Sequence, residues 1–355
     1  MKIAVIGAGA VGGAIAAVAD RAGHELVVTA RGEHLVTLER DGLRLSGAWG
    51  EHLARPRAAE TLLDLPDVAS GEWRPDLVLL AVKAQDARSA LAANAPVLDG
   101  VPLAVVQNGL GGAEAAAAQL PSTPVIGALA LFAASYLDPG RVSITASGST
   151  YLGRIPRIPS PAEAARMAPP DDAAALRVAV EALSPVIPLE TTDDFAGAQW
   201  TKLLVNHVNA LPAITGLSVQ QTIADPHLRA VLLASMKETI GIARAKGVRF
   251  APVQGLDDRL LRFVQRAPRI LAQLVPRAMA RRMGATPNPG STLQSIRRGQ
   301  LTEIDHLNGA VVAAAADLGL PAPVNATLVS LVHAVERDHR FRTPAEVAAA
   351  LHANR

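Results

Sequence analysis

The chain of 355 residues contains no cysteine and few aromatic residues, with five Phe, three Trp and two Tyr. The absence of cysteine excludes disulfides, thiolate zinc sites and cysteine nucleophiles. So few aromatic rings argue against a base-stacking surface for single-stranded nucleic acid. The 34 basic and 32 acidic side chains leave a formal charge of only +2, which argues against a general nucleic-acid-binding protein.

Long uninterrupted apolar runs are also missing. The longest stretch without a charged residue, 115–137, contains two prolines and several polar side chains, unlike a membrane helix of ~20 apolar residues. The apolar stretch after Met1 and Lys2 resembles a signal peptide, but four glycines interrupt it in a pattern that has a better explanation. We therefore expect a cytoplasmic protein with no membrane span and no nucleic-acid partner.

The first half of the chain alternates short aliphatic runs with helical segments. Continuous Val, Ile and Leu runs of this kind are typical of a parallel sheet covered on both faces. Two further segments, 43–47 and 141–145, are predicted to be added antiparallel strands. The aliphatic runs predicted to form the parallel sheet are 3–8, 25–29, 76–82 and 102–107.

The second half has no strand pattern, and from Asp193 its apolar residues recur with the spacing of helices. The fold class predicted is a Rossmann-type, doubly wound α/β domain over residues 1–190, followed by an all-helical domain over 191–355. Proline-rich residues 154–172 are interpreted as a surface loop or insertion whose role the sequence does not reveal.

A glycine-rich turn follows the first aliphatic run. Gly7, Gly9 and Gly12, with Ala10 and Val11 between the last two, fit the pattern G-x-G-x-x-G between a strand and a helix. The first glycine permits a tight turn, the second lets the backbone approach a pyrophosphate, and the third allows close helix–strand packing. This context predicts a dinucleotide-binding site.

The end of the second strand indicates which dinucleotide binds. An NAD site has an acidic residue there to bind the ribose hydroxyls, but this sequence has Arg31. An arginine can pair with the 2′-phosphate of NADP, so we expect NADPH as the cofactor; the alternative is a solvated loop arginine. Lys83 and Asn108 follow the next two strands. Both are expected to contact the cofactor, and Asn108 also the substrate. The alternatives are an ordinary surface lysine for Lys83 and a simple turn for Asn108.

A helix predicted over residues 200–210 carries unusual polar residues. Lys202, Asn206 and Asn209 share one face of it at i, i+4 and i+7. Because the flanking residues are aliphatic, these polar groups need partners and are expected to line a cleft, unless the lysine extends to the surface. A desolvated lysine has a lowered pKa and suits proton transfer near neutral pH. His207 is expected to be a packed or surface histidine.

A second polar segment covers residues 288–309. Ser291 and Gln294 have the form of a capping box that opens a helix, and that helix N-terminus could also bind a carboxylate. The helix is predicted to continue to residue 309 with Glu303 at the edge of its apolar stripe. Glu303 and His306 have metal-ligand spacing, but no second cluster completes a site, so we expect no metal.

Taken together, these segments resemble the ketopantoate reductase (2-dehydropantoate 2-reductase) family over nearly the whole chain. The resemblance rests on GAGAVGG at the start and on four later segments: VKAQD at 82–86, QNGLGG at 107–112, KLLVNHVNAL at 202–211 and GSTLQSIRRGQLTEIDHLNG at 290–309. It implies NADPH-dependent reduction of the 2-oxo acid 2-dehydropantoate to pantoate in pantothenate and coenzyme A synthesis.

The resemblance also implies roles for individual residues. Lys202 matches the general acid of the family, and Glu303 matches the glutamate that holds the lysine or the nascent hydroxyl. Asn108 matches an asparagine that contacts cofactor and substrate, while Arg31 and Lys83 match basic residues near the NADP phosphates. The residues that match substrate-binding groups are Asn206, Asn288 and Ser291.

One departure concerns the substrate. Some family members have an asparagine where this sequence has Ala210, so Asn209 is expected to substitute, or the pocket accepts another 2-oxo acid. A different 2-oxo acid is therefore one alternative function, and a non-catalytic NADPH sensor is another, since fold does not determine function. The predicted long helices 223–247 and 253–283 offer surface for a homodimer.

Overall fold

The computed structural model describes residues 1–156, 170–282 and 287–353. These residues divide into two compact units, one made of Met1–Gln107 with Gly111–Phe195 and the other of Asn108–Leu110 with Ala196–Arg355. Among the described residues no helix is long and apolar enough to cross a bilayer. Most of the proline-rich segment, residues 157–169, lies outside the described residues.

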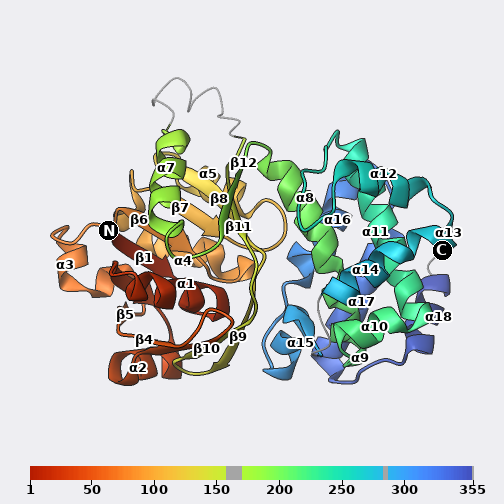
Figure 1. The fold of residues 1–355 in the computed structure, drawn as a ribbon, viewed down its shortest axis with the longest axis horizontal. Helices are drawn as coiled ribbons and strands as arrows, with labels where there is room; N and C mark the ends of the chain where they lie inside the picture. The colour runs from red at the N-terminus through yellow and green to blue at the C-terminus, as the bar shows by residue number, and fades with distance from the viewer. Residues whose placement is uncertain (157–169, 283–286, 354–355) are drawn as a thin grey trace. The chain divides into compact units, whose positions relative to one another are not determined.

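The first unit contains an eight-stranded sheet in the order β12-β11-β8-β7-β6-β1-β2-β5 (Figure 1). All neighbouring pairs from β5 to β8 are parallel, β11 is antiparallel to β8, and β12 is parallel to β11. The chain runs outward from β1 to β2 and then returns to the other side of β1 at β6, as in a Rossmann-type sheet. The strands of this sheet are β1 (Lys2–Ile6), β2 (Glu25–Thr29), β5 (Arg57–Ala59), β6 (Leu77–Leu80), β7 (Leu103–Val106), β8 (Val125–Ala130), β11 (Thr150–Arg154) and β12 (Leu189–Thr192).

A second, four-stranded sheet has the order β4-β3-β10-β9. Its central strands, β3 and β10, were expected to be added antiparallel strands, and this expectation is wrong for their mutual pairing. They run parallel to each other, and only the outer strands β4 and β9 are antiparallel to them. Local sequence cannot encode such a pairing between distant segments. The strands are β3 (Leu43–Gly47), β4 (His52–Ala54), β9 (Ala133–Asp138) and β10 (Arg141–Ala146).

Helix α1 packs against β1 and β2 and against all four strands of the second sheet. Residues 12–19 of this helix are therefore buried all round, which explains why they are only Gly, Ala, Ile and Val. The helices of this unit are α1 (Ala10–Arg21), α2 (Gly32–Asp41), α3 (Pro66–Ala69), α4 (Ala84–Leu98), α5 (Gly112–Gln119) and α7 (Asp172–Leu183), with a 3₁₀ turn η1 (Leu62–Asp64).

The described part of the second unit consists of helices and the segments that connect them, with no strand apart from one isolated bridge between Val253 and Leu256. Its core gathers around α9, whose six residues are all buried, and the long helix α11. Its helices are α8 (Phe195–Asn206), α9 (Ala210–Thr215), α10 (Val219–Ala224), α11 (Pro226–Ala245), α12 (Asp258–Arg266), α13 (Arg269–Ala272), α14 (Leu274–Arg282), α15 (Gly290–Arg297), α16 (Asn308–Ala316), α17 (Pro323–Asp338) and α18 (Pro344–Ala353), with 3₁₀ turns η2 (His207–Asn209) and η3 (Ile304–His306).

Three predicted helices are interrupted in the structure. The one over 200–210 changes to the 3₁₀ turn η2 after Asn206 and resumes as α9. The one over 290–309 ends at Arg297, and Gly299 then adopts a positive φ of 63°, which an α-helix does not allow. The segment 253–283 is split into α12, α13 and α14.

Candidate functional site

The glycine-rich turn occupies the loop between β1 and α1, and its three glycines differ in what surrounds them. Gly7 has a φ of 102°, and a Cβ there would lie 2.8 Å from the backbone nitrogen of Val82. A Cβ on Gly12 would lie 2.1 Å from the carbonyl oxygen of Gly7. A Cβ on Gly9 would meet nothing within 4 Å. The first and third glycines thus allow close packing, while the second leaves open space at the N-terminus of α1.

Neighbouring groups fix this turn. The backbone nitrogen of Gly7 donates to Thr29 Oγ1 at 2.9 Å. The His34 ring lies 2.7 Å from the Ala8 carbonyl oxygen through Nε2 and accepts from the Gly140 nitrogen at 3.0 Å through Nδ1. This arrangement requires the neutral ring with its proton on Nε2, and burial lowers the pKa of His34 accordingly.

Arg31 lies two residues after the end of β2 and is the N-cap residue of α2. Its side chain is exposed, and the following residue, Gly32, has open space around the position of a Cβ. The strand end carries no acidic residue; the nearest acid in sequence, Glu33, lies in the first turn of α2. Arg31 is therefore placed at the strand end where dinucleotide sites recognise the adenosine ribose.

Lys83 is the N-cap residue of α4 and follows β6, the strand beside β1. Its side chain is half-buried. The preceding residue, Val82, accepts a hydrogen bond from Gln107 Nε2 at 3.0 Å through its carbonyl oxygen and also packs closely on Gly7. Lys83 therefore follows the carboxyl end of a strand next to the glycine-rich turn, where open α/β sheets bind ligands.

Lys202 lies on α8 in the second unit and is only 5% exposed. Desolvation by burial lowers the pKa of its ammonium group from 10.5 to about 8, although the negative charge of Glu303 opposes this change. A lysine with such a pKa is mostly protonated at neutral pH and gives up its proton readily. The prediction of a buried lysine with a lowered pKa is confirmed.

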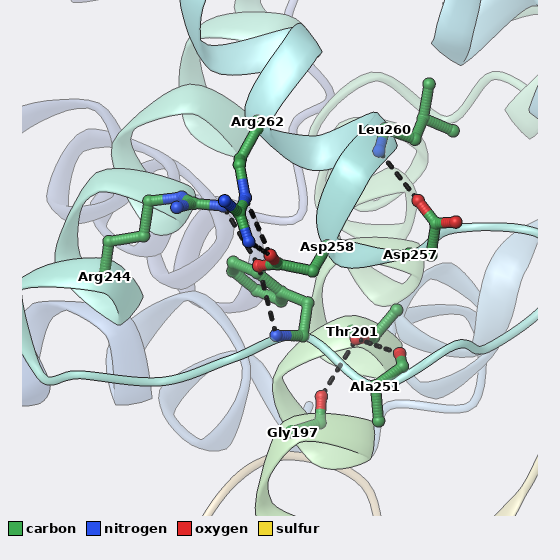
Figure 2. A network of polar contacts seen from close by, with 9 residues as sticks. Gly197, Thr201, Arg244, Ala251, Asp257, Asp258, Leu260 and Arg262 are labelled. Carbon is green, nitrogen blue, oxygen red and sulfur yellow. Dashed lines mark hydrogen bonds and ion pairs between the residues drawn. The ribbon is translucent and has the colours of Figure 1, made fainter.

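The surroundings of α8 hold this lysine in place. The hydroxyl of Thr201 lies 2.9 Å from the Gly197 carbonyl oxygen and 2.7 Å from that of Ala251 (Figure 2). The segment that contains Ala251 is anchored in turn by Asp258, whose Oδ1 atom accepts from the Phe250 nitrogen at 3.5 Å and whose carboxylate pairs with Arg244 at 3.0 Å and with Arg262 (Figure 2). Sequence patterns gave no indication of this anchor, because its members come from three separate segments.

Glu303 lies on the segment between α15 and η3, as the N-cap residue of η3, and not on a helix as predicted. Asn108 Nδ2 lies 3.5 Å from its Oε2 atom. Gly109 brings Asn108 to this segment: its φ is 89°, and a Cβ there would lie 2.1 Å from the His306 carbonyl oxygen. The structure thus places Lys202, Glu303 and Asn108 together within the second unit.

Asn206 and Asn209 follow Lys202 at the end of α8 and in η2. The Nδ2 atom of Asn206 is buried and has no hydrogen-bond partner among the described residues. Such a buried donor without a partner costs free energy unless a ligand accepts from it. The side chain of Asn209 packs against Gly290, whose missing Cβ would lie 2.6 Å from Asn209 Oδ1. Ala210 is buried.

Asn288 and Ser291 lie at the start of α15. The backbone nitrogen of Gly290 donates to Asn288 Oδ1 at 2.8 Å, and the Asn288 nitrogen donates to Gln220 Oε1 at 3.0 Å. The predicted capping box of Ser291 and Gln294 is wrong, because α15 begins at Gly290 after Pro289 and has no side-chain cap. The Ser291 hydroxyl is exposed in the first helical turn.

His207 is packed, as expected, in a buried polar network. Its Nδ1 atom is 2.9 Å from Asn308 Nδ2 and its Nε2 atom is 3.0 Å from Thr239 Oγ1. These contacts fit the neutral ring with its proton on Nε2, and burial lowers the pKa of His207 to about 3. Asn308 continues to Asn325 at 2.8 Å. The network joins the segment after Asn206 to the segment after Glu303.

Two family models cover most of the chain. The model described as ketopantoate reductase PanE/ApbA matches residues 3–157, and the model of the C-terminal part of the same family matches residues 194–336. A 2-dehydropantoate 2-reductase of Halobacterium salinarum is 30% identical over 343 residues, which cover 95% of this chain and 100% of the relative. The chain belongs to the ketopantoate reductase family. The resemblance predicted from the sequence is confirmed, and the chain is a member of an oxidoreductase family.

The fold of this chain matches solved structures, among them one of the ketopantoate reductase family. The crystal structure of a PanE/ApbA family ketopantoate reductase from Ralstonia eutropha matches with a TM-score of 0.73 and 31% identity, covering 95% of this chain and 99% of that one. A D-mandelate dehydrogenase with NADH and anilino(oxo)acetate has the same TM-score at 20% identity, over 96% of this chain and 100% of that one. The second likeness concerns the fold alone. The predicted Rossmann-type unit followed by a helical unit is confirmed.

Proposed function

We propose that this member of the ketopantoate reductase family reduces 2-dehydropantoate to pantoate with NADPH, in coenzyme A biosynthesis. The observation that carries the proposal is the buried Lys202, whose pKa is about 8 and whose ammonium interacts electrostatically with the Glu303 carboxylate. The names of the relatives that match over nearly the whole chain support the same reaction.

Lys202 is the general acid in this proposal. Reduction of a 2-oxo acid requires a proton at the C2 carbonyl oxygen while a hydride reaches C2. The Lys202 ammonium donates to that oxygen, first as a hydrogen bond and then as a proton, and a pKa near the operating pH is what a general acid needs. Glu303 keeps the lysine charged before the reaction, and the amide of Asn108 orients the carboxylate of Glu303.

The remaining polar residues of the second unit bind the substrate. Asn206 offers a buried amide donor that lacks a partner in the protein, and an oxygen of the substrate would accept from it. The exposed hydroxyl of Ser291 and the first turn of α15 suit the substrate carboxylate. Asn209 and Asn288 flank Gly290 at the start of that helix, and we assign them to the same pocket.

The first unit binds the cofactor. When bound, NADPH supplies the hydride that reduces C2. The open space over Gly9 and the uncapped N-terminus of α1, with Ala10 and Val11 in its first turn, fit a pyrophosphate. Arg31 then pairs with the 2′-phosphate, and Lys83 with another phosphate oxygen. The absence of an acid at the end of β2 supports NADPH over NADH.

The proposal is tested by NADPH oxidation with 2-dehydropantoate as the substrate. The buried Ala210, at the position where some family members have asparagine, favours a second candidate, a reductase of another 2-oxo acid. A comparison of kcat/KM over a panel of 2-oxo acids separates the two. Tight NADPH binding without turnover of any 2-oxo acid would refute both and indicate a sensor.

A further inference from the structure

The short segment that carries Glu303 is attached to helix α17 on both sides of the glutamate. Before it, the backbone nitrogen of Thr302 donates to Glu336 Oε1 at 2.8 Å. After it, Asp305 Oδ1 lies 2.9 Å from His333 Nε2. His333 and Glu336 also contact each other, with 2.6 Å between Nδ1 and Oε2. The two attachments are thus linked through the imidazole ring.

Both ring nitrogens of His333 face carboxylate oxygens, which accept hydrogen bonds and cannot donate them. A neutral imidazole has one N–H group and can satisfy only one of these contacts, whereas an imidazolium satisfies both. Partial burial would lower the pKa of His333, but the hydrogen bonds and charges of Glu336 and Asp305 outweigh it and raise the pKa above 6.5. Among the described residues, the charged groups that face the ring are Asp305 from η3 and Glu336 from α17.

We propose that His333 is a positioning residue: as an imidazolium it fixes the segment from Thr302 to Asp305 and thereby holds the Glu303 carboxylate beside Lys202. Ile304 is fully buried between the two attachments, so a shift of the segment moves Glu303 as well. The inference rests on the proposed function, in which Glu303 keeps the lysine charged. Turnover therefore falls as His333 loses its proton, with no change at the cofactor.

The kinetic test uses the full chain and four proteins, with kcat and KM measured between pH 6 and 9. His333→Gln removes the cation, His333→Lys keeps a cation throughout the range, and His227→Gln changes an exposed histidine of α11 as the matched control. We expect His333→Gln to lower kcat about 10- to 100-fold at pH 6, as a misplaced catalytic group does, with an unchanged KM for NADPH. The ratio of wild-type to His333→Gln kcat should shrink as pH rises, and His333→Lys should recover most of the loss.

An activity-independent measurement keeps the two hypotheses separate. Amide hydrogen exchange of residues 301–307, compared at one pH, should be faster in His333→Gln and in Glu336→Gln than in the wild type and the His227→Gln control. Equal exchange and equal kcat in His333→Gln and wild type would overturn the positioning role. A wild-type protein that reduces no 2-oxo acid would instead overturn the proposed function, while the exchange experiment would still test the attachment of the segment.

Discussion

Replacing Lys202 with methionine should make the protein more stable and nearly inactive. Methionine has a similar length and carries no charge, so it fills the same buried space. The pKa of Lys202 is lowered from 10.5 to about 8 by burial, which means that the folded state binds the proton less well than the unfolded chain. At pH 7 this difference destabilises the folded wild type by about 3 kcal/mol, and the variant lacks that cost.

Because the pKa of Lys202 is lowered in the folded state, the stability difference between Lys202→Met and the wild type depends on pH in a characteristic way. Below pH 8 the lysine is charged in both states and the cost is complete. Between pH 8 and 10.5 only the unfolded chain keeps the proton, so the wild type gains stability as pH rises. The advantage of Lys202→Met should therefore fall from about 3 kcal/mol at pH 7 to about 1 kcal/mol at pH 9.5.

Urea unfolding at both pH values measures the difference, with Lys246→Met as the control because Lys246 lies at the surface. Turnover of Lys202→Met should be about 10²- to 10⁴-fold lower than that of the wild type. Equal or lower stability of Lys202→Met at pH 7, or an advantage that does not change with pH, would refute a charged, desolvated lysine. Near-normal turnover of the folded variant would refute the general acid.

Five other substitutions test the site and the core. Arg31→Ala should raise the KM for NADPH by roughly 10- to 100-fold and leave that for NADH nearly unchanged; an unchanged cofactor preference would contradict the assignment. Gly9→Ala should weaken NADPH binding in a titration without altering Tm, whereas Gly12→Ala should lower Tm, because its Cβ would lie 2.1 Å from a carbonyl oxygen. Glu303→Gln removes the charge that raises the lysine pKa, so the alkaline decline of kcat should move below pH 8, and an unmoved profile would count against the pair. His207, whose pKa is lowered to about 3, must take up a proton on unfolding below pH 6.5; His207→Gln should flatten the acid loss of stability by about 1.4 kcal/mol per pH unit, and parallel curves would contradict its neutral state.

The first unit could be predicted well because its signals are local. Strands β1, β2, β6 and β7 are buried on both faces, so each is a continuous aliphatic run in the sequence. The glycine-rich turn is also local, since Gly7 and Gly12 are constrained by atoms of the same strand–turn–helix unit and of the residues that follow the neighbouring strand β6. The parallel pairing of β3 with β10 was not predictable, because nothing in either segment specifies the other.

The helical unit shows where periodicity misleads. Leu293, Ile304, Leu307 and Val311 are all buried, and their spacing predicted one continuous helix. In the structure they come from α15, η3, the residue after η3 and α16, and the last three, Ile304, Leu307 and Val311, reach one core from separate segments. An apolar stripe indicates which residues are buried, but it does not show that they all belong to one helix. For this reason the prediction that Glu303 lies on a helix is wrong. Nothing in the sequence indicates that its segment is attached to α17 through His333 and Glu336.

Polar residues in an apolar helix pose the sharper problem, as the neighbours Asn206 and His207 illustrate. Both are polar residues in an aliphatic segment, and the sequence separates them only by helix face, since Asn206 shares the face of Lys202 and His207 does not. Both ring nitrogens of His207 have partners within the protein, so it is part of the scaffold. Asn206 Nδ2 is buried without a partner among the described residues. Since a protein rarely leaves a buried donor unsatisfied, the unpartnered amide supports the substrate-binding role proposed for Asn206, and this difference in hydrogen bonding is visible only in the three-dimensional structure.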